Sequence, residues 1–407
     1  MSPLQSLLLS PRVLLGCGIV TLIILILSQG HSQGTGSQGV AWVKGTSHNH
    51  ENSSPLQKKI SEVYNSTLGF EKIFALSLPE RLDHRDSLTL TSVLTSFHLD
   101  FVDGIKYQDI LNKTLPAHDG IAYNGARGAW RGHINAMREI VDKGYGSALI
   151  FEDDADWDIR LKDQLRDFAI ASNGLLSQYP GTHEPHFANR AGDYIDYSDL
   201  ATWLRVQDSR IQTPHSPYGD GWDVLWLGNC GMRMAARADE WQTLPIVRQA
   251  DPTVLPVEHY AHWDWADPHP YDNYPNRTRL YLSQPSDGVC SIAYAVSQQG
   301  ARRILLELGI ERADKAMDLM LQDFCQGGWD GGLPHPCWGV LPPLFEQYRP
   351  AGLESKDSDI VTGSDEVRFR VDGFTANIQQ SVRMNARKLL AEPVGEVVDQ
   401  YQYDQGT

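Results

Sequence analysis

Apolar and polar residues alternate along the chain in blocks that predict strands and helices in turn. Short apolar runs of strand length occur at residues 71–78, 99–105, 148–151, 222–229 and 340–350, and at the start of 291–308. Apolar residues recur at helical spacing in residues 86–96, 125–143, 160–172 and 314–321, and in the second half of 291–308. The first strand, helix and strand form the opening of a βαβ unit, so we predict an α/β fold.

One of these strands runs directly into a cluster of carboxylates. Residues 147–158 read SALIFEDDADWD, with no turn residue between the apolar run and Glu152, Asp153, Asp154, Asp156 and Asp158. Open α/β sheets bind ligands at the carboxyl ends of their strands, and crowded carboxylates repel one another unless a cation is present. Such acidic sites suit Mg²⁺ or Mn²⁺, usually together with substrate phosphates. We therefore predict a cation site here, and a solvated acidic loop is the alternative.

Two other segments are expected to border the same edge of the sheet. Arg81 and Arg85 follow the first strand, where a guanidinium can contact a diphosphate in a forked geometry. A solvated basic turn is the alternative for both. The helix predicted at residues 125–143 begins with three glycines, carries His133 and leads into the acidic strand. His133 is either a ligand contact or a core residue, and Gly144 predicts the end of the helix.

Composition and charge narrow the class of protein. The 407 residues suffice for one large or two ordinary domains, and 41% hydrophobic and 21% charged residues are normal for a globular protein. A formal net charge of −16 argues against a general nucleic-acid binder, because such a protein needs a basic face.

The N-terminus carries a membrane signal. The segment Val13–Leu27 has no charged residue; Arg12 precedes it, and the next Lys or Arg is Lys44. This asymmetry predicts a cytoplasmic tail at 1–12, a signal anchor at 13–29 and the rest of the chain across the membrane. The apolar run is shorter than the roughly 20 residues of a full span, so a cleaved signal peptide, which would give a secreted protein, is the alternative.

Sequons and cysteines agree with a lumenal chain. Glycosylation sequons occur at Asn52, Asn65, Asn112 and Asn276. Apart from Cys17 in the apolar segment, four cysteines remain to form disulfides in an oxidising compartment, with three possible pairings: Cys230, Cys290, Cys325 and Cys337.

Composition also divides the chain. Residues 30–69 are rich in small polar residues and predict a flexible lumenal stem. Residues 70–350 carry the predicted strands and helices and form one domain. Within it, residues 250–276 mix aromatic and short polar side chains as a carbohydrate surface does. Residues 351–407 are polar and charged, and we expect an extended tail there.

The ordered set of motifs resembles glycosyltransferase family 25, the lipopolysaccharide glycosyltransferase-like group, and its fungal members most. The resemblance covers about residues 70–360. It rests on FALSLPERLDHR, the G-x-x-G-x-x-x-x-H run ending at His133, ALIFEDDADWD, WDVLWLGNCG, AYAVSQQGARRIL, MDLML, and PPLFEQYRPAG followed by SDI. The chain departs from the pattern of many members at Ser77, Ala126, Ala129 and Gly132.

The resemblance implies a GT-A-like, Rossmann-type fold with a single catalytic domain. It implies inverting transfer of a hexose, galactose or glucose, from a UDP-sugar to a hydroxyl of a glycan or glycoprotein. It also implies Mn²⁺ or Mg²⁺ as cofactor, and it fits a type II protein of the Golgi or another secretory-pathway membrane. The alternatives are a glycan-binding protein of the same fold that has lost catalysis, and a metal-dependent phosphoester hydrolase.

Residue roles follow from the resemblance and from strand geometry. Glu152-Asp153-Asp154 is the counterpart of the family's D-x-D signature. Because residues two apart on an extended chain point the same way, we expect Asp154 to bind the metal together with Glu152 or Asp156. The expected donor contacts are Arg81, Arg85, His133, Glu152 and Asp153. An inverting transfer also needs a base, for which we expect Asp318, with Asp287 as the alternative.

Overall fold

The computed structural model describes residues 53–176, 194–196, 213–233, 246–261, 275–327, 334–354, 357–360 and 368–401. The expected cytoplasmic tail, the signal anchor and part of the stem lie outside the described residues, as do residues 262–274 of the aromatic segment 250–276. Within the described ranges, no helix is both long enough and apolar enough to cross a membrane.

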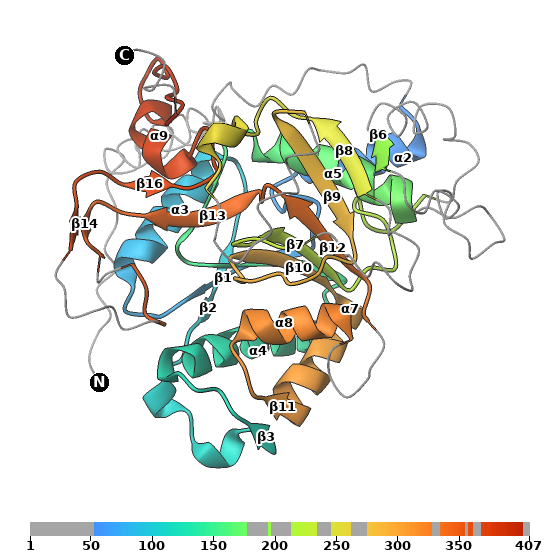
Figure 1. The fold of residues 1–407 in the computed structure, drawn as a ribbon, viewed down its shortest axis with the longest axis vertical. Coiled ribbons are helices and arrows are strands. Elements are labelled where there is room, and N and C mark those ends of the chain that lie inside the picture. The colour runs from blue at the N-terminus through green and yellow to red at the C-terminus, as the bar shows by residue number, and fades with distance from the viewer. Residues whose placement is uncertain are drawn as a thin grey trace, which may run out of the picture. The chain divides into compact units, whose positions relative to one another are not determined.

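A large mixed sheet forms the centre of the fold (Figure 1). Within the described residues its order is β2 (Asp100–Asp103), β1 (Lys72–Ser77), β4 (Ser147–Glu152), β10 (Ala293–Ser297), β7 (Val224–Gly228), β12 (Cys337–Leu341), β9 (Thr278–Ser283), β8 (Ile246–Ala250) and β6 (Tyr194–Asp196). β2, β1 and β4 run parallel, and β10 is antiparallel to both of its neighbours. The predicted α/β class is confirmed, and the arrangement is compatible with a Rossmann-like fold.

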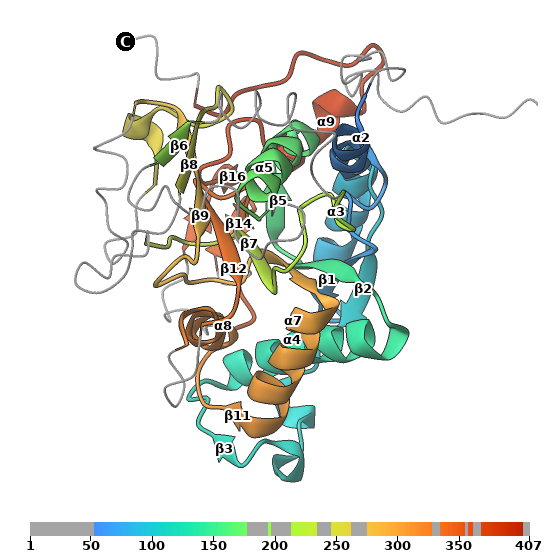
Figure 2. The same cartoon turned by 90° about the vertical axis from the view of Figure 1, so that its right-hand side faces the viewer.

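Helices cover both faces of this sheet (Figure 2). Leu149 and Phe151 of β4 belong to one core cluster, with α3 (Leu82–Leu94), α5 (Leu161–Leu176) and α9 (Val382–Leu389). Ala148 and Ile150 belong to the other, with α4 (Asn124–Lys143), α7 (Gln298–Ile304) and α8 (Met317–Gln326). Because both faces are covered, β4 is a continuous apolar run rather than an alternating one. As predicted, α4 ends at Gly144, which has a left-handed φ of 73°.

The shorter elements complete the described part of the chain. The 3₁₀ turns are η3 (Ser61–Tyr64), η4 (Tyr107–Asp109), η5 (Asn112–Thr114) and η6 (Val257–His259), and a π-helical segment, η8 (Leu305–Glu311), continues α7. β3 (His118–Asp119) pairs with β11 (Arg312–Ala313), and β14 (Gly352–Leu353) pairs with β15 (Phe369–Arg370). The disulfides join Cys230 to Cys290 and Cys325 to Cys337, one of the three pairings left open by the sequence.

The N-terminal boundary expected at Phe70 is wrong. The helix α2 (Pro55–Ile60) begins inside the segment predicted to be a stem and buries Leu56 and Ile60. The side chain of Ser54 accepts a hydrogen bond from the Gln57 backbone N–H, and the side-chain oxygen of Gln57 accepts one from the Ser54 backbone N–H. This capping box starts a helix that the polar composition of the segment conceals.

The extended tail expected from Ala351 is also wrong. The predicted last strand is two strands, β12 and β13 (Phe345–Arg349), separated by Pro342 and Pro343, which cannot donate ladder hydrogen bonds. β13 pairs on one side with β5 (Ala155–Trp157) and on the other with β16 (Phe374–Thr375). Helix α9 follows and packs against α3 with Val382 and Leu389 buried.

The burial of α9 gives a prediction for stability. Leu389 is 6% exposed and its neighbour Leu390 is 56% exposed. We expect Leu389→Ala to lower the free energy of unfolding by about 2 kcal/mol or more, because it leaves a cavity in the core. Leu390→Ala should change it by less than about 0.5 kcal/mol. Urea unfolding of both variants measures this, and equal effects would show that α9 does not belong to the folded domain.

Candidate functional site

A cavity of about 420 Å³ opens at the carboxyl ends of β1, β2 and β4. β2 lies on one side of β1 and β4 on the other, and α3 and α4 cover opposite faces of the sheet. The chain order therefore reverses at β1, which is where open α/β sheets form their ligand crevice. Most of the wall comes from residues at or after the ends of the three strands and from α4, and Gln347 and residues 357–360 complete it. The acidic stretch thus lies where the sequence predicts a site.

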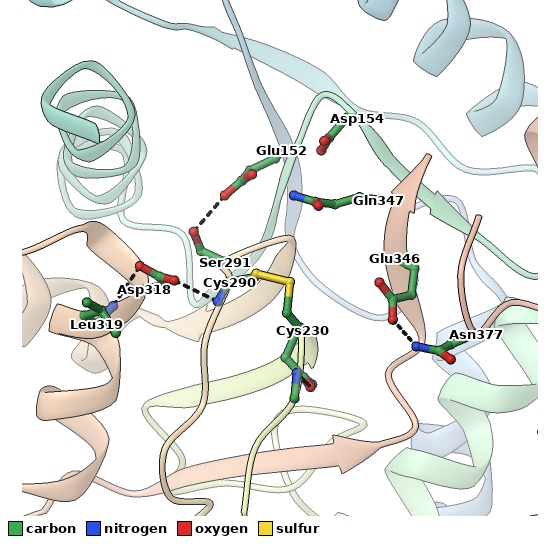
Figure 3. The surroundings of a disulfide bond; sticks show 12 residues. Glu152, Asp154, Cys230, Cys290, Ser291, Asp318, Leu319, Glu346, Gln347 and Asn377 are labelled. Carbon is green, nitrogen blue, oxygen red and sulfur yellow. Dashed lines mark hydrogen bonds between the residues drawn. A yellow bond between two sulfur atoms is a disulfide. The ribbon is translucent and has the colours of Figure 1, made fainter. Parts of the chain in front are cut away.

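Glu152 and His133 meet on one wall of the cavity. His133 is 1% exposed, and its Nδ1 lies 2.8 Å from the hydroxyl of Tyr294. Its Nε2 lies 3.6 Å from Glu152 Oε1, which also accepts a 2.7 Å hydrogen bond from Ser291 Oγ (Figure 3). His133 is thus a buried residue that also forms part of the cavity wall, and its contact with a ligand stays a prediction.

Asp153 faces residues that follow β1. One of its carboxylate oxygens accepts a 2.7 Å hydrogen bond from Ser77 Oγ, and the other lies 2.8 Å from His84 Nδ1. The guanidinium of Arg81 contacts His84 Nε2 and forms an ion pair with Asp359, and all of these side chains line the cavity. His84 was not among the site residues predicted from the sequence, although it lies three residues after Arg81 in the first turn of α3, on the same side of that helix.

Arg85 has a different place from Arg81. It donates to the Ser77 carbonyl at 2.9 Å and to Asp103 at 2.5 Å, and its guanidinium lies 4.8 Å from the centre of the Phe101 ring. These contacts join the ends of β1 and β2. Among the described residues that line the cavity, Arg81 is present and Arg85 is not.

Asp154 is the least compensated carboxylate of the acidic turn. It is 9% exposed, and its Oδ2 lies 3.4 Å from Nη1 of Arg349. Its Oδ1 is buried and has no hydrogen-bond partner among the described residues. Burial, and then the negative charge of Glu152, raises the pKa of Asp154 to about 7, although Arg349 opposes this rise. An added cation would supply the missing partner.

Asp156 and Asp158 point away from the cavity. Asp156 is fully buried and accepts hydrogen bonds from Thr375, Ser381 and the Trp157 backbone N–H. Asp158 pairs with Arg160 at 2.7 Å. Asp153 and Asp154 form a turn between β4 and β5, so the rule that residues two apart point the same way does not extend to Asp156. Of the two expected ligand pairs, the geometry brings Glu152 and Asp154 to the cavity and excludes Asp156.

Asp318 and Asp287 do not belong to the described cavity wall. Asp318 accepts a 2.8 Å hydrogen bond from the Cys290 backbone N–H and a 2.9 Å bond from that of Leu319 (Figure 3). Asp287 accepts a 3.0 Å hydrogen bond from Gln322. Asp318 therefore holds the backbone at Cys290, and the next residue, Ser291, donates a hydrogen bond to Glu152.

Glycines let α4 approach the site. A Cβ on Gly128 would lie 2.8 Å from the Ile105 carbonyl oxygen, whereas a Cβ on Gly132 would meet no atom within 4 Å. Gly132 thus faces the open cavity that it lines.

This contrast predicts opposite effects of one substitution. Gly132→Ala should raise the free energy of unfolding by up to about 1 kcal/mol, because alanine favours a helix and its Cβ has free space. Gly128→Ala should lower it despite the same gain in propensity, since the backbone at Ile105 must shift. Urea unfolding of both variants compares them. A stabilised Gly128→Ala variant would contradict the close contact.

Glu346 is a buried acid that the sequence analysis did not single out. It is 5% exposed, accepts a 2.7 Å hydrogen bond from Asn377 Nδ2 and precedes Gln347 of the cavity wall. Burial raises the pKa of Glu346 to about 8 from its ordinary 4.5.

The raised pKa predicts how stability depends on pH. Between about 4.5 and 8 the folded state keeps a proton on Glu346 that the unfolded state releases, so this group makes stability fall as pH rises through that window. Glu346→Gln keeps an acceptor for Asn377 and cannot ionise. We expect its urea midpoint to decline less than the wild-type midpoint from pH 5 to pH 8.5. Parallel pH profiles would contradict a protonated Glu346.

No protein-family model matches this chain.

Proposed function

We propose that this chain is a metal-dependent glycosyltransferase with a GT-A-like fold, which moves a hexose from a UDP-sugar to a hydroxyl of a glycan or glycoprotein with inversion. The observation that carries the proposal is the buried, unpartnered Oδ1 of Asp154, at the edge of a cavity where an α/β sheet binds its ligand. A buried carboxylate oxygen without a partner is costly unless a ligand completes it.

The donor set suits a hard cation that also binds phosphate. In the described part of the chain, no group of three or more His, Cys, Asp or Glu side chains is arranged to hold a metal ion alone. Mg²⁺ and Mn²⁺ are commonly held by one or two carboxylates, with substrate phosphates and water as the other ligands. Asp154 would be such a ligand, with Glu152 assisting. When bound, the cation would neutralise the charge of the diphosphate leaving group.

Two basic residues of the wall can contact an anionic ligand. Arg81 and His84 line the side after β1, where a guanidinium and an imidazole can contact phosphate oxygens. Ser291 donates a hydrogen bond to Glu152 and His133 lies beside it, and these two contacts hold the orientation of the Glu152 carboxylate. Neither Asp318 nor Asp287 lines the cavity, so the geometry does not favour either as the base.

We also propose a lumenal location for this domain in the secretory pathway. Both disulfides are of the kind that persists in oxidising compartments. The described sequon residues, Asn65, Asn112 and Asn276, are exposed, as a glycan acceptor must be.

Loss of Asp154 tests the proposed activity. We expect the wild-type protein to release UDP from UDP-galactose or UDP-glucose only with Mn²⁺ or Mg²⁺, and Asp154→Asn to reduce this by about 100-fold or more, the scale for removing one essential electrostatic contact. Asp142→Asn, an exposed change at the far end of α4, is the matched control. Full activity in excess EDTA, or an active Asp154→Asn variant, would overturn the proposal.

A further inference from the structure

The turn Asp153–Ala155 is held mainly by residues 351–407, which were expected from the sequence to form an extended tail. The backbone carbonyls of Asp153, Asp154 and Ala155 each accept a hydrogen bond from beyond β12. The Tyr348 N–H donates to Asp154 O at 2.8 Å. The other two carbonyls are held by one side chain, Arg383 of α9.

Arg383 spans the turn with its whole guanidinium. Its Nη2 donates to the carbonyls of Asp153 and Ala155, both at 2.8 Å, and its Nε donates to Ala155 O at 3.0 Å. Nη1 donates to Ser87 Oγ of α3 at 2.9 Å, and the guanidinium lies 5.3 Å from the centre of the Tyr348 ring. A planar fork with several donors is required for this set of contacts, and lysine cannot reproduce it.

The same segment also donates hydrogen bonds to a side chain of the acidic stretch. The carboxylate of Asp156 accepts from Thr375 and Ser381, and the Arg383 backbone N–H lies 3.3 Å from its Oδ1. The C-terminal segment thus holds both the backbone of the turn and its buried carboxylate. The side chains of Asp153 and Asp154 line the cavity, and the C-terminal segment holds the backbone that carries them between β4 and β5.

We propose that Arg383 is a positioning residue, which fixes the turn Asp153–Ala155 in the shape that binds the metal and the diphosphate. This inference rests on the proposed function. Outer contacts that orient metal ligands typically contribute 10- to 100-fold in metal affinity. Without Arg383, the carbonyls of Asp153 and Ala155 lose this donor and the turn can relax, so the orientation of the Asp154 carboxylate is lost before the sheet is disturbed.

The experiment compares Arg383→Ala and Arg383→Lys with Arg387→Ala, an exposed change of the same charge on the same helix. Mn²⁺ binding in the presence of UDP is measured by titration, and exchange of the backbone amides of residues 153–157 is measured in the free protein. We expect Arg383→Ala to weaken Mn²⁺ binding by roughly 10- to 100-fold, Arg383→Lys to lie between it and the wild type, and Arg387→Ala to match the wild type. Amide exchange should rise in the same order.

The two measurements separate the possible failures. Unchanged exchange and unchanged Mn²⁺ binding in a folded Arg383 variant would overturn the positioning role. Should Arg383→Ala fail to fold, Arg383→Lys decides by the same criteria. A wild-type protein that binds no Mn²⁺ with UDP, while the exchange response is intact, would instead overturn the proposed function and leave Arg383 as the clamp of the turn.

Discussion

Negative charges that are crowded at the end of a buried strand must each be compensated, and this constraint organises the structure around β4. Glu152 is held by Ser291 beside His133, and Asp153 is flanked by Ser77 and His84. Asp156 is buried and accepts hydrogen bonds from the hydroxyls of Thr375 and Ser381, and Asp158 pairs with Arg160. Asp154 has a loose contact with Arg349 and one oxygen without a partner. Four of the five neighbouring carboxylates are thus compensated by other side chains, and Asp154 is the one whose charge an added cation would stabilise most.

Sheet topology determines that this residue lies at a cavity. Because the chain reverses its order at β1, α3, which follows β1, and α4, which precedes β4, cover opposite faces and leave a crevice between them. Helix α4 closes one side of the crevice, and Gly128 lets its backbone approach Ile105. The disulfide between Cys230 and Cys290, together with Asp318, fixes the segment that orients Glu152. Segments that are distant in sequence therefore act together to orient the few side chains that line this crevice.

Local patterns in the sequence predicted the elements well where apolar residues recur. The acidic strand, the glycine-rich helix and its end at Gly144 are found as expected, because periodicity and caps act over a few residues. The folded stem and tail were missed because they contribute few apolar residues. They are held by caps and by polar contacts such as those of Asp156 with Thr375 and Ser381, which join residues more than 200 positions apart. No local pattern reports such contacts, and for the same reason Asp156 was misplaced.

The placement of Asp154 is better explained by binding than by stability. A buried acid whose pKa is raised to about 7 weakens the fold at neutral pH, and its neighbours could have compensated it as they do Asp153 or Asp156. Arg349 is near enough to limit this cost, but it lies 3.4 Å away and also approaches the Asp357 carbonyl at 3.3 Å. Local departures from good compensation are expected at functional sites, where the ligand completes what the protein leaves open. The same reasoning explains why the backbone of this turn is held so closely by Arg383 and Tyr348. A carboxylate without a strong partner keeps its direction only if the chain that carries it cannot move.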